Sequence, residues 1–168
     1  MRKLVAGGLS VAVAASIAVA PVDAGPARAL TASPEVALAA TVLTLEGGLV
    51  GIQHLVHFTP MQLQGSLCKA PNTCQPVDYP AWPLGDYFNK QGAALLNDAI
   101  AKLPVDAPVV PFGHSQGGQV IYAAVRGWTA NPTTAPDPSR LSWVSIGNPE
   151  NAFGGTKRKD GLPPDTPY

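Results

Sequence analysis

The sequence has 168 residues, and its 11 Lys and Arg balance its 11 Asp and Glu. That length suits one globular domain and is short for two, and the even charge argues against nucleic acid as a partner, which binds strongly basic surfaces. With 46% hydrophobic and 13% charged residues, the chain is too apolar for a disordered tail and has enough apolar side chains for a buried core.

The first thirty residues have the pattern of a secretory leader. Arg2 and Lys3 precede an uncharged apolar run over residues 4–20, and small residues follow up to Ala29. This order is typical of a signal peptide. A signal anchor that stays in the membrane is the alternative, but a span needs roughly 20 firmly apolar residues, and glycines, serines and a proline weaken this run.

We place the cleavage site after Ala29, with Ala24 as the second choice. Residues 1–29 are then a signal peptide, and residues 30–168 are a single domain. Export through such a leader predicts a protein that is secreted or held at the cell envelope.

Two short patterns open the mature chain. The β-branched and aliphatic run Thr41–Leu45 predicts a buried strand, and Gly47 and Gly48 predict a turn directly after it. Thr59 and Pro60 then predict the start of a helix, with Thr59 as its cap and Pro60 at its first position.

Cys68 and Cys74 enclose five residues that include the turn formers Pro71 and Asn72. In the oxidising compartment that export implies, such a pair is expected as a disulfide, with free thiols as the alternative. A bridge across so short a loop would stabilise the fold by roughly 2 kcal/mol. Two cysteines without a second pair or a suitably spaced histidine make a poor metal site, so we expect no metal. Residues 71–83 have the composition of a loop.

Helices and strands alternate from Asp86 onward. Apolar side chains recur on one face from there to Leu103, and Pro104 should end this helix. A strand over residues 108–112, a helix over 119–128, a loop over 131–139, a strand over 141–146 and a loop-like tail over 154–168 follow. This alternation predicts an α/β fold, a mostly parallel sheet flanked by helices.

The segment between the strand over residues 108–112 and the helix over 119–128 carries the clearest chemical pattern. It reads Gly113-His114-Ser115-Gln116-Gly117 and fits G-x-S-x-G, in which a nucleophilic serine occupies a sharp strand-to-helix turn. A glycine-rich turn without chemical meaning is the alternative. Pro111 also argues the other way, because it removes a hydrogen-bond donor from an expected central strand.

A serine hydroxyl becomes a useful nucleophile only when a base takes its proton and donors stabilise the oxyanion. The backbone N–H of Gln116 is expected as one donor, and the Gly47-Gly48 turn is expected to supply the second. The alternative is that Gly47 and Gly48 only end the preceding strand.

The sequence does not identify the base and the acid that would complete a catalytic triad with Ser115. Acidic residues follow Ser115 at Asp137, Glu150, Asp160 and Asp165, but no histidine does. His114 adjoins the serine and should point away from its hydroxyl. His54 and His57 precede the serine; either could act as a base, since triads are defined by geometry, but packing or surface positions are preferred.

Taken together, residues 41–168 resemble the PE-PPE domain family, mycobacterial serine hydrolases of the α/β-hydrolase fold that are related to cutinases. The most specific match is the strand with Gly147-Asn148-Pro149 and the following Gly154-Gly155. The other matching segments are residues 57–63, 112–117 and 164–168.

The resemblance implies an exported serine esterase that forms an acyl-enzyme at Ser115 without a cofactor. The substrate would be a small-molecule or lipid acyl ester, either hydrolysed or used for acyl transfer onto envelope glycolipids, with association at the envelope or a membrane surface. In the family the catalytic Asp and His lie beyond the segment that resembles residues 164–168, so we expect a partial α/β-hydrolase fold that lacks the C-terminal strands and helices. A catalytically inactive envelope or lipid-binding module, or a fragment without a stable fold of its own, are the alternatives.

Overall fold

The computed structural model describes residues 39–49, 52, 54–82, 85–163 and 166. The leader expected at residues 1–29 and the carboxylate of Asp165 lie outside these residues. No helix in the described ranges is long and apolar enough to cross a membrane.

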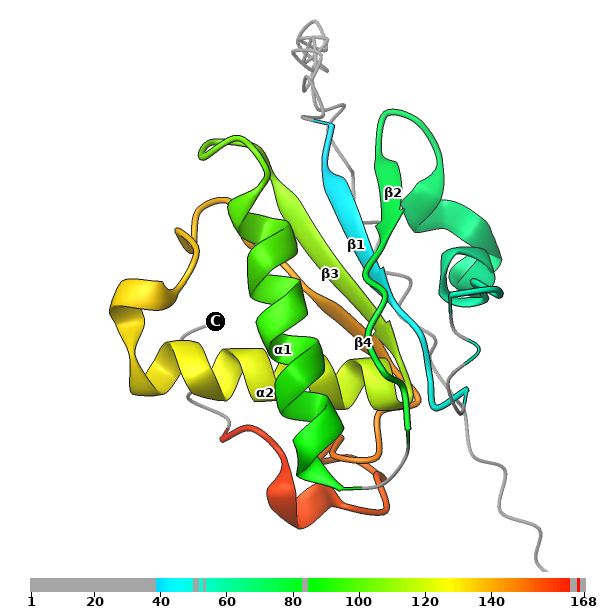
Figure 1. Ribbon diagram of the computed structural model, residues 1–168, viewed down its shortest axis with the longest axis vertical. Coiled ribbons are helices and arrows are strands. Elements are labelled where there is room, and N and C mark those ends of the chain that lie inside the picture. Colours follow the sequence, from blue (N-terminus) through cyan, green and yellow to red (C-terminus); the bar gives the residue numbers. More distant parts are fainter. Residues whose placement is uncertain (1–38, 50–51, 53, 83–84, 164–165, 167–168) are drawn as a thin grey trace, which may run out of the picture. The chain divides into compact units, whose positions relative to one another are not determined.

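Four parallel strands form one sheet in the order β2-β1-β3-β4 (Figure 1). The strands are β1 (Thr41–Leu45), β2 (Thr73–Pro76), β3 (Val109–His114) and β4 (Val144–Ile146). The longer helices are α1 (Asp86–Ala101) and α2 (Gln116–Ala130). The 3-10 segments are η1 (Thr59–Cys68), η2 (Pro132–Thr134) and η3 (Arg158–Asp160).

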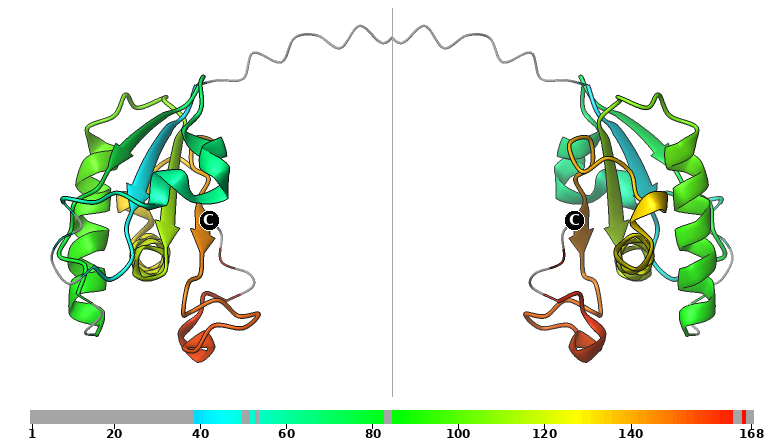
Figure 2. Two further views of the ribbon diagram at one scale, coloured as in Figure 1. Left: turned by 90° about the vertical axis from the view of Figure 1, so that its right-hand side faces the viewer. Right: turned by 90° about the vertical axis from the view of Figure 1, so that its left-hand side faces the viewer.

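Both α-helices cover one face of the sheet, and η1 lies on the opposite face (Figure 2). The main core fills the space between helices and sheet. Leu43 and Leu45 from β1 pack there with Leu96 of α1 and with Ile121 and Trp128 of α2. The predicted α/β class is therefore confirmed.

One strand was not predicted and one predicted strand boundary was wrong, and each error has a physical reason. Residues 71–83 were expected as a loop, but Thr73–Pro76 forms the edge strand β2 beside β1. Its side chains are mostly exposed and show no apolar alternation, so periodicity could not reveal it. The same segment carries Cys74, which forms the expected disulfide with Cys68.

The other error concerns β4, which was expected over residues 141–146 but begins only at Val144. The Val109 N–H donates to the Arg140 carbonyl at 2.9 Å, and the Ser115 N–H donates to the Ile146 carbonyl at 2.8 Å. Pro111 lies between them and has no N–H to donate on that side. The ladder is therefore interrupted, leaving Leu141 in an isolated bridge.

Smaller corrections concern the helices. α2 begins at Gln116, directly after the serine, rather than at residue 119. The N-cap of η1 is Phe58 rather than Thr59; the Thr59 N–H donates to the Glu46 carboxylate, and its hydroxyl donates to the Leu45 carbonyl at the end of β1. In the tail expected as loop, residues 158–160 form η3.

Candidate active site

Ser115 lies in the turn between β3 and α2, at the carboxyl edge of the sheet. Its backbone has φ 52° and ψ −112°, a region that residues other than glycine avoid at a cost of about 1–3 kcal/mol. The turn is secured by the hydrogen bond from the Ser115 N–H to the end of β4. A strained, partly exposed serine at this edge has the geometry expected of a nucleophile.

The glycines around Ser115 are required by close packing. A Cβ on Gly113 would lie 2.4 Å from the carbonyl of Gly117, and a Cβ on Gly117 would lie 2.2 Å from the carbonyl oxygen of Leu45. α2 therefore starts in backbone contact with the end of β1. Because of this contact, Ser115 lies beside the turn that follows β1.

Gln116 follows the serine as the first residue of α2, and its side chain is fixed on both sides. Its Nε2 donates to the carbonyl of Trp82 at 2.7 Å and to Oδ1 of Asn89 at 3.2 Å. Its backbone N–H makes no hydrogen bond within the described residues, as is general for the first N–H groups of a helix. This N–H is thus free to donate a hydrogen bond to an oxygen that develops negative charge.

Gly47 is buried beside the serine, whereas Gly48 is exposed. A Cβ on Gly47 would lie 3.3 Å from Cβ of Ser115 and 3.3 Å from Nδ1 of His114. Neither glycine N–H has a hydrogen-bond acceptor in the part of the chain that is described. The structure therefore brings Gly47 next to Ser115, as a second oxyanion donor requires, although that role stays a prediction.

Glu46, directly before Gly47, anchors the turn after β1 through hydrogen bonds that the sequence did not predict. Its carboxylate, 4% exposed, accepts the Thr59 N–H at 2.8 and 3.1 Å, and its carbonyl accepts the hydroxyl of Tyr79. Burial, and secondly the negative charge of Glu46, raise the pKa of Tyr79 far above its usual range. The only sequence signal was an isolated Glu directly before the two glycines.

The histidines lie around the turn without engaging the serine. The His114 ring lies between two turns: Cβ atoms built on Gly47 and Gly147 would lie 3.3 and 3.6 Å from its ring atoms. His54 is exposed, and Nδ1 of His57 is buried without a hydrogen-bond partner. Among the described residues, none of the three hydrogen-bonds to Ser115.

Two of the acidic residues after the serine, Glu150 and Asp137, have partners in the local structure. Glu150 is 2% exposed, and its carboxylate accepts hydrogen bonds from Gln119 at 3.1 Å and from Arg126 at 2.8 Å. Hydrogen bonds from Ser139 lower the pKa of Asp137. These carboxylates therefore have partners other than a catalytic base.

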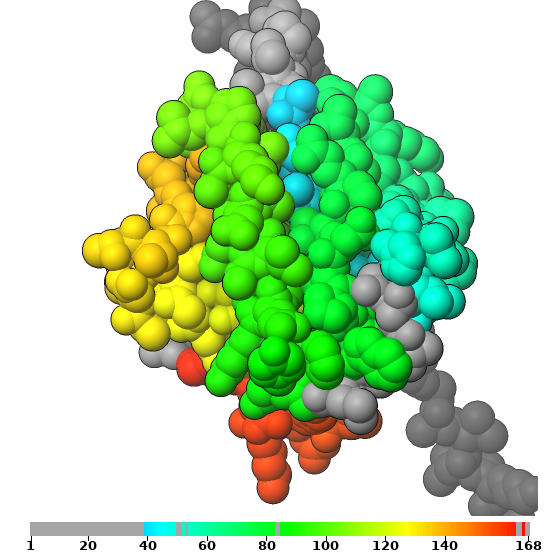
Figure 3. Space-filling view, viewed as in Figure 1, coloured from blue at the N-terminus to red at the C-terminus, as the bar shows by residue number. Residues whose placement is uncertain are grey.

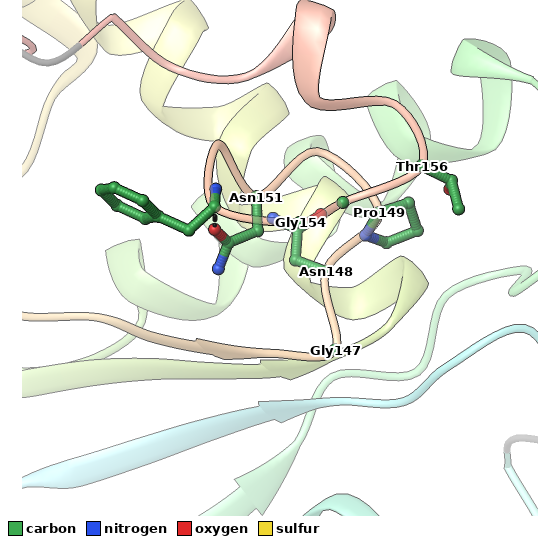
Figure 4. A pocket seen from close by; sticks show the side chains of 8 residues that line it. Gly147, Asn148, Pro149, Asn151, Gly154 and Thr156 are labelled. Atoms are coloured by element: carbon green, nitrogen blue, oxygen red, sulfur yellow. Dashed lines mark hydrogen bonds between the residues drawn. The ribbon is translucent and has the colours of Figure 1, made fainter.

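A cavity of about 460 Å³ lies in the loop after β4 (Figure 4). A Cβ on Gly147, at its edge, would lie 4.0 Å from the Ser115 backbone nitrogen. Nδ2 of the buried Asn148 has no partner within the described residues. The lining residues are Gly147, Asn148, Pro149, Asn151, Phe153, Gly154, Gly155 and Thr156.

Comparison with known proteins adds a family and a few structures. The family model described as the PE-PPE domain matches residues 63–162. PE family protein PE3 of Mycobacterium tuberculosis is 42% identical over 94 residues, which cover 46% of this chain and 20% of that protein. The chain thus spans only about a fifth of this curated relative.

Two solved structures are similar at low identity. An acetyl xylan esterase has a TM-score of 0.47 and 20% identity, over 69% of this chain and 66% of the other. A cutinase-like protein from Cryptococcus sp. has a TM-score of 0.43 and 15% identity, over 67% of this chain and 54% of the other.

Proposed function

The chain belongs to the PE-PPE domain family, and from this premise we propose that it is an exported serine hydrolase that acts on acyl esters through an acyl-enzyme at Ser115. The observation that supports the proposal is the position of Ser115. It lies in a strained turn, directly before the free N–H of Gln116 and beside the buried Gly47. The substrate is a small-molecule or lipid acyl ester, and the protein works at the envelope or a membrane surface.

The chemistry follows from these positions. Oγ of Ser115 adds to the ester carbonyl carbon while a base takes its proton, and the carbonyl oxygen becomes an oxyanion. The N–H groups of Gln116 and Gly47 donate to that oxygen. Collapse of the tetrahedral intermediate expels the alcohol with a proton and leaves the acyl group on Ser115. Water then completes hydrolysis, or a second alcohol completes acyl transfer.

The second candidate is a lipid-binding module without catalysis. It is favoured by one observation, that no histidine hydrogen-bonds to Ser115 in the described ranges. Without a base, a serine and its oxyanion donors retain only residual catalysis.

A fluorophosphonate probe separates the two candidates, because it reacts covalently with an activated serine. We expect labelling of the full chain that is lost in Ser115→Ala and kept in Ser139→Ala, a matched change at an exposed serine. No labelling of protein shown to be folded by circular dichroism, or labelling that persists in Ser115→Ala, would reject the esterase and favour the binding module.

A further inference from the structure

The segment that follows β1, and begins beside the serine turn, is unusually free of charge. Residues 47–68 include no Asp, Glu, Lys or Arg, whereas about three are expected from the 13% of the whole chain. Uncharged runs normally lie in the core, as β3 and the first half of α2 do here. The described residues of this stretch (47–49, 52 and 54–68) instead lie largely at the surface, and only Gly47 and Thr59 among them are buried.

Half of the exposed large apolar side chains in the described residues belong to this one segment. They are Leu55 (71% exposed), Met61 (62%), Ile52 (49%), Leu63 (48%) and Phe58 (45%). We call these five residues the apolar surface. Such a concentration marks an interaction site, whereas single exposed apolar residues are ordinary. In Figure 3 this cyan-to-teal part of the chain forms one flank of the molecule, away from the yellow end of α2.

The exposure of these side chains is fixed by the fold beneath them. Thr59, in the middle of the segment, is fully buried and bonds through its N–H to Glu46 and through its hydroxyl to the Leu45 carbonyl. Leu63 and Gln64 have φ 52° and 58°, in the left-handed region that side chains disfavour. The segment is thus anchored and strained with its apolar side chains outward, although burying them would be favourable.

The apolar surface lies close to the serine turn. The segment begins at Gly47, in contact with Ser115, and Thr59, in the middle of the segment, donates to the Leu45 carbonyl that Gly117 also approaches. An occupant of the apolar surface therefore lies beside the turn that holds Ser115. The segment offers no charged group for an ion pair at the rim, which protein partners usually provide. Acyl chains need only apolar contact, and their ester carbonyls lie at the end of the chains.

We propose that the apolar surface is a docking face for an aggregate of uncharged lipid, which seats the protein so that ester carbonyls reach Ser115. This inference rests on the proposed function and narrows its substrate to esters of aggregated lipid. A short, soluble ester would gain nothing from such a face.

The test uses the full chain with Ser115→Ala, so that binding is measured without turnover. An environment-sensitive fluorophore is attached at Leu55→Cys or, as the control, at Val105→Cys, an 84% exposed apolar position before β3. Vesicles of phosphatidylcholine, a lipid without net charge, should increase the fluorescence at position 55 and leave position 105 unchanged. Because the face is uncharged, high salt should not weaken the effect.

A second variant provides an independent measurement. Leu55→Asp with Met61→Asp should weaken vesicle binding about tenfold or more, since two apolar contacts are replaced by charges; Val105→Asp should not. Both changed positions are exposed, so the unfolding transition should stay near that of the parent chain. If the pair does not fold, Leu55→Ser alone replaces it, with a smaller loss expected.

Three results would overturn the proposal. One is a fluorophore at position 55 that stays in water while vesicles are present, and another is binding that survives the double substitution. The third is a fluorescence change that depends on protein concentration without lipid, which would assign the face to a second copy of the chain. Failure of the proposed function is separate, because it shows as absent labelling of Ser115 by the soluble probe, whatever the vesicles do.

Discussion

Gly117 is the point where α2 meets the end of β1, and its missing side chain sets the distance between them. Gly117→Ala would put a Cβ 2.2 Å from the Leu45 carbonyl oxygen, and the backbone must move to relieve the overlap. We expect a loss of about 3 kcal/mol in the free energy of unfolding, measured by urea denaturation. The shift should also displace Ser115 and slow its labelling.

Gly127→Ala is the matched control, since Gly127 lies in the same helix with no atom within 4 Å of its built Cβ. There the greater helix propensity of alanine should stabilise the protein by up to about 1 kcal/mol. Equal urea midpoints for the two variants would contradict the close packing described at Gly117.

At this scale the sequence predicted residues whose role is local and missed those that act across the chain. Ser115 and its glycines belong to one short motif, so a pattern could find them. Glu46 meets Thr59, which is 13 positions away, and Gln116 meets Asn89, which is 27 positions away. No periodicity relates such pairs, and only the folded arrangement of β1, α1 and α2 brings them together.

Among the elements, those with a strong local pattern were predicted best. β1 has the predicted bounds because a continuous β-branched and aliphatic run marks it, and α1 starts at the predicted residue because apolar side chains recur on one face from there. β2 was not predicted, because an edge strand with exposed side chains shows no apolar pattern. The interruption before β4 depends on Pro111 in a neighbouring strand, so the register was needed to see it.

Tyr79 connects the segment after β2 to the turn after β1, and its ionisation should destabilise this connection. Burial and the charge of Glu46 raise its pKa in the folded protein, whereas an unfolded tyrosine has a pKa of about 10. Above about pH 10 the unfolded chain loses a proton that the folded protein keeps. The free energy of unfolding should therefore fall by up to about 1.4 kcal/mol per pH unit for this one group.

Urea denaturation between neutral pH and pH 11 measures this effect. Tyr79→Phe should reduce the slope, and at neutral pH it should cost about 1 kcal/mol for the lost hydrogen bond to the Glu46 carbonyl. Tyr87→Phe, at a 65% exposed tyrosine, should keep the slope of the parent chain. A slope that is the same in all three proteins would show that Tyr79 titrates normally.

At the scale of the whole molecule, one polar network ties three separate parts to each other. Arg126 on α2 donates to the Glu150 carboxylate in the loop after β4 and to the Asp160 carbonyl in η3. The Glu150 N–H in turn donates to Oδ1 of Asn148 at 2.9 Å. The same loop lines the cavity near Ser115. The hydrogen bonds from α2 therefore help to fix the conformation of the loop that lines it.

The two partners of the ion pair should respond unequally to substitution, because Glu150 is buried while the Arg126 side chain is 43% exposed. Arg126→Met leaves a buried carboxylate with Gln119 as its remaining side-chain partner, and should cost about 2 kcal/mol, less than a fully buried pair because water reaches the arginine. Glu150→Gln leaves an arginine that water can solvate, and should cost about 1 kcal/mol. In the double variant the losses should not add, with a coupling of about 1 kcal/mol.

Urea denaturation of the four proteins in the cycle gives these values, with Arg158→Met as a control at an exposed arginine of η3. Hydrogen exchange supplies a local measure: amides of residues 147–161 should exchange faster in Arg126→Met, while those of β1 and β3 change only as much as global stability does. If additive losses were found, or if Arg126→Met were no more destabilising than Arg158→Met, the loop would owe its shape to its own backbone turns. If the coupling is found, the loop that lines the cavity depends on α2, the helix that also begins at the candidate nucleophile.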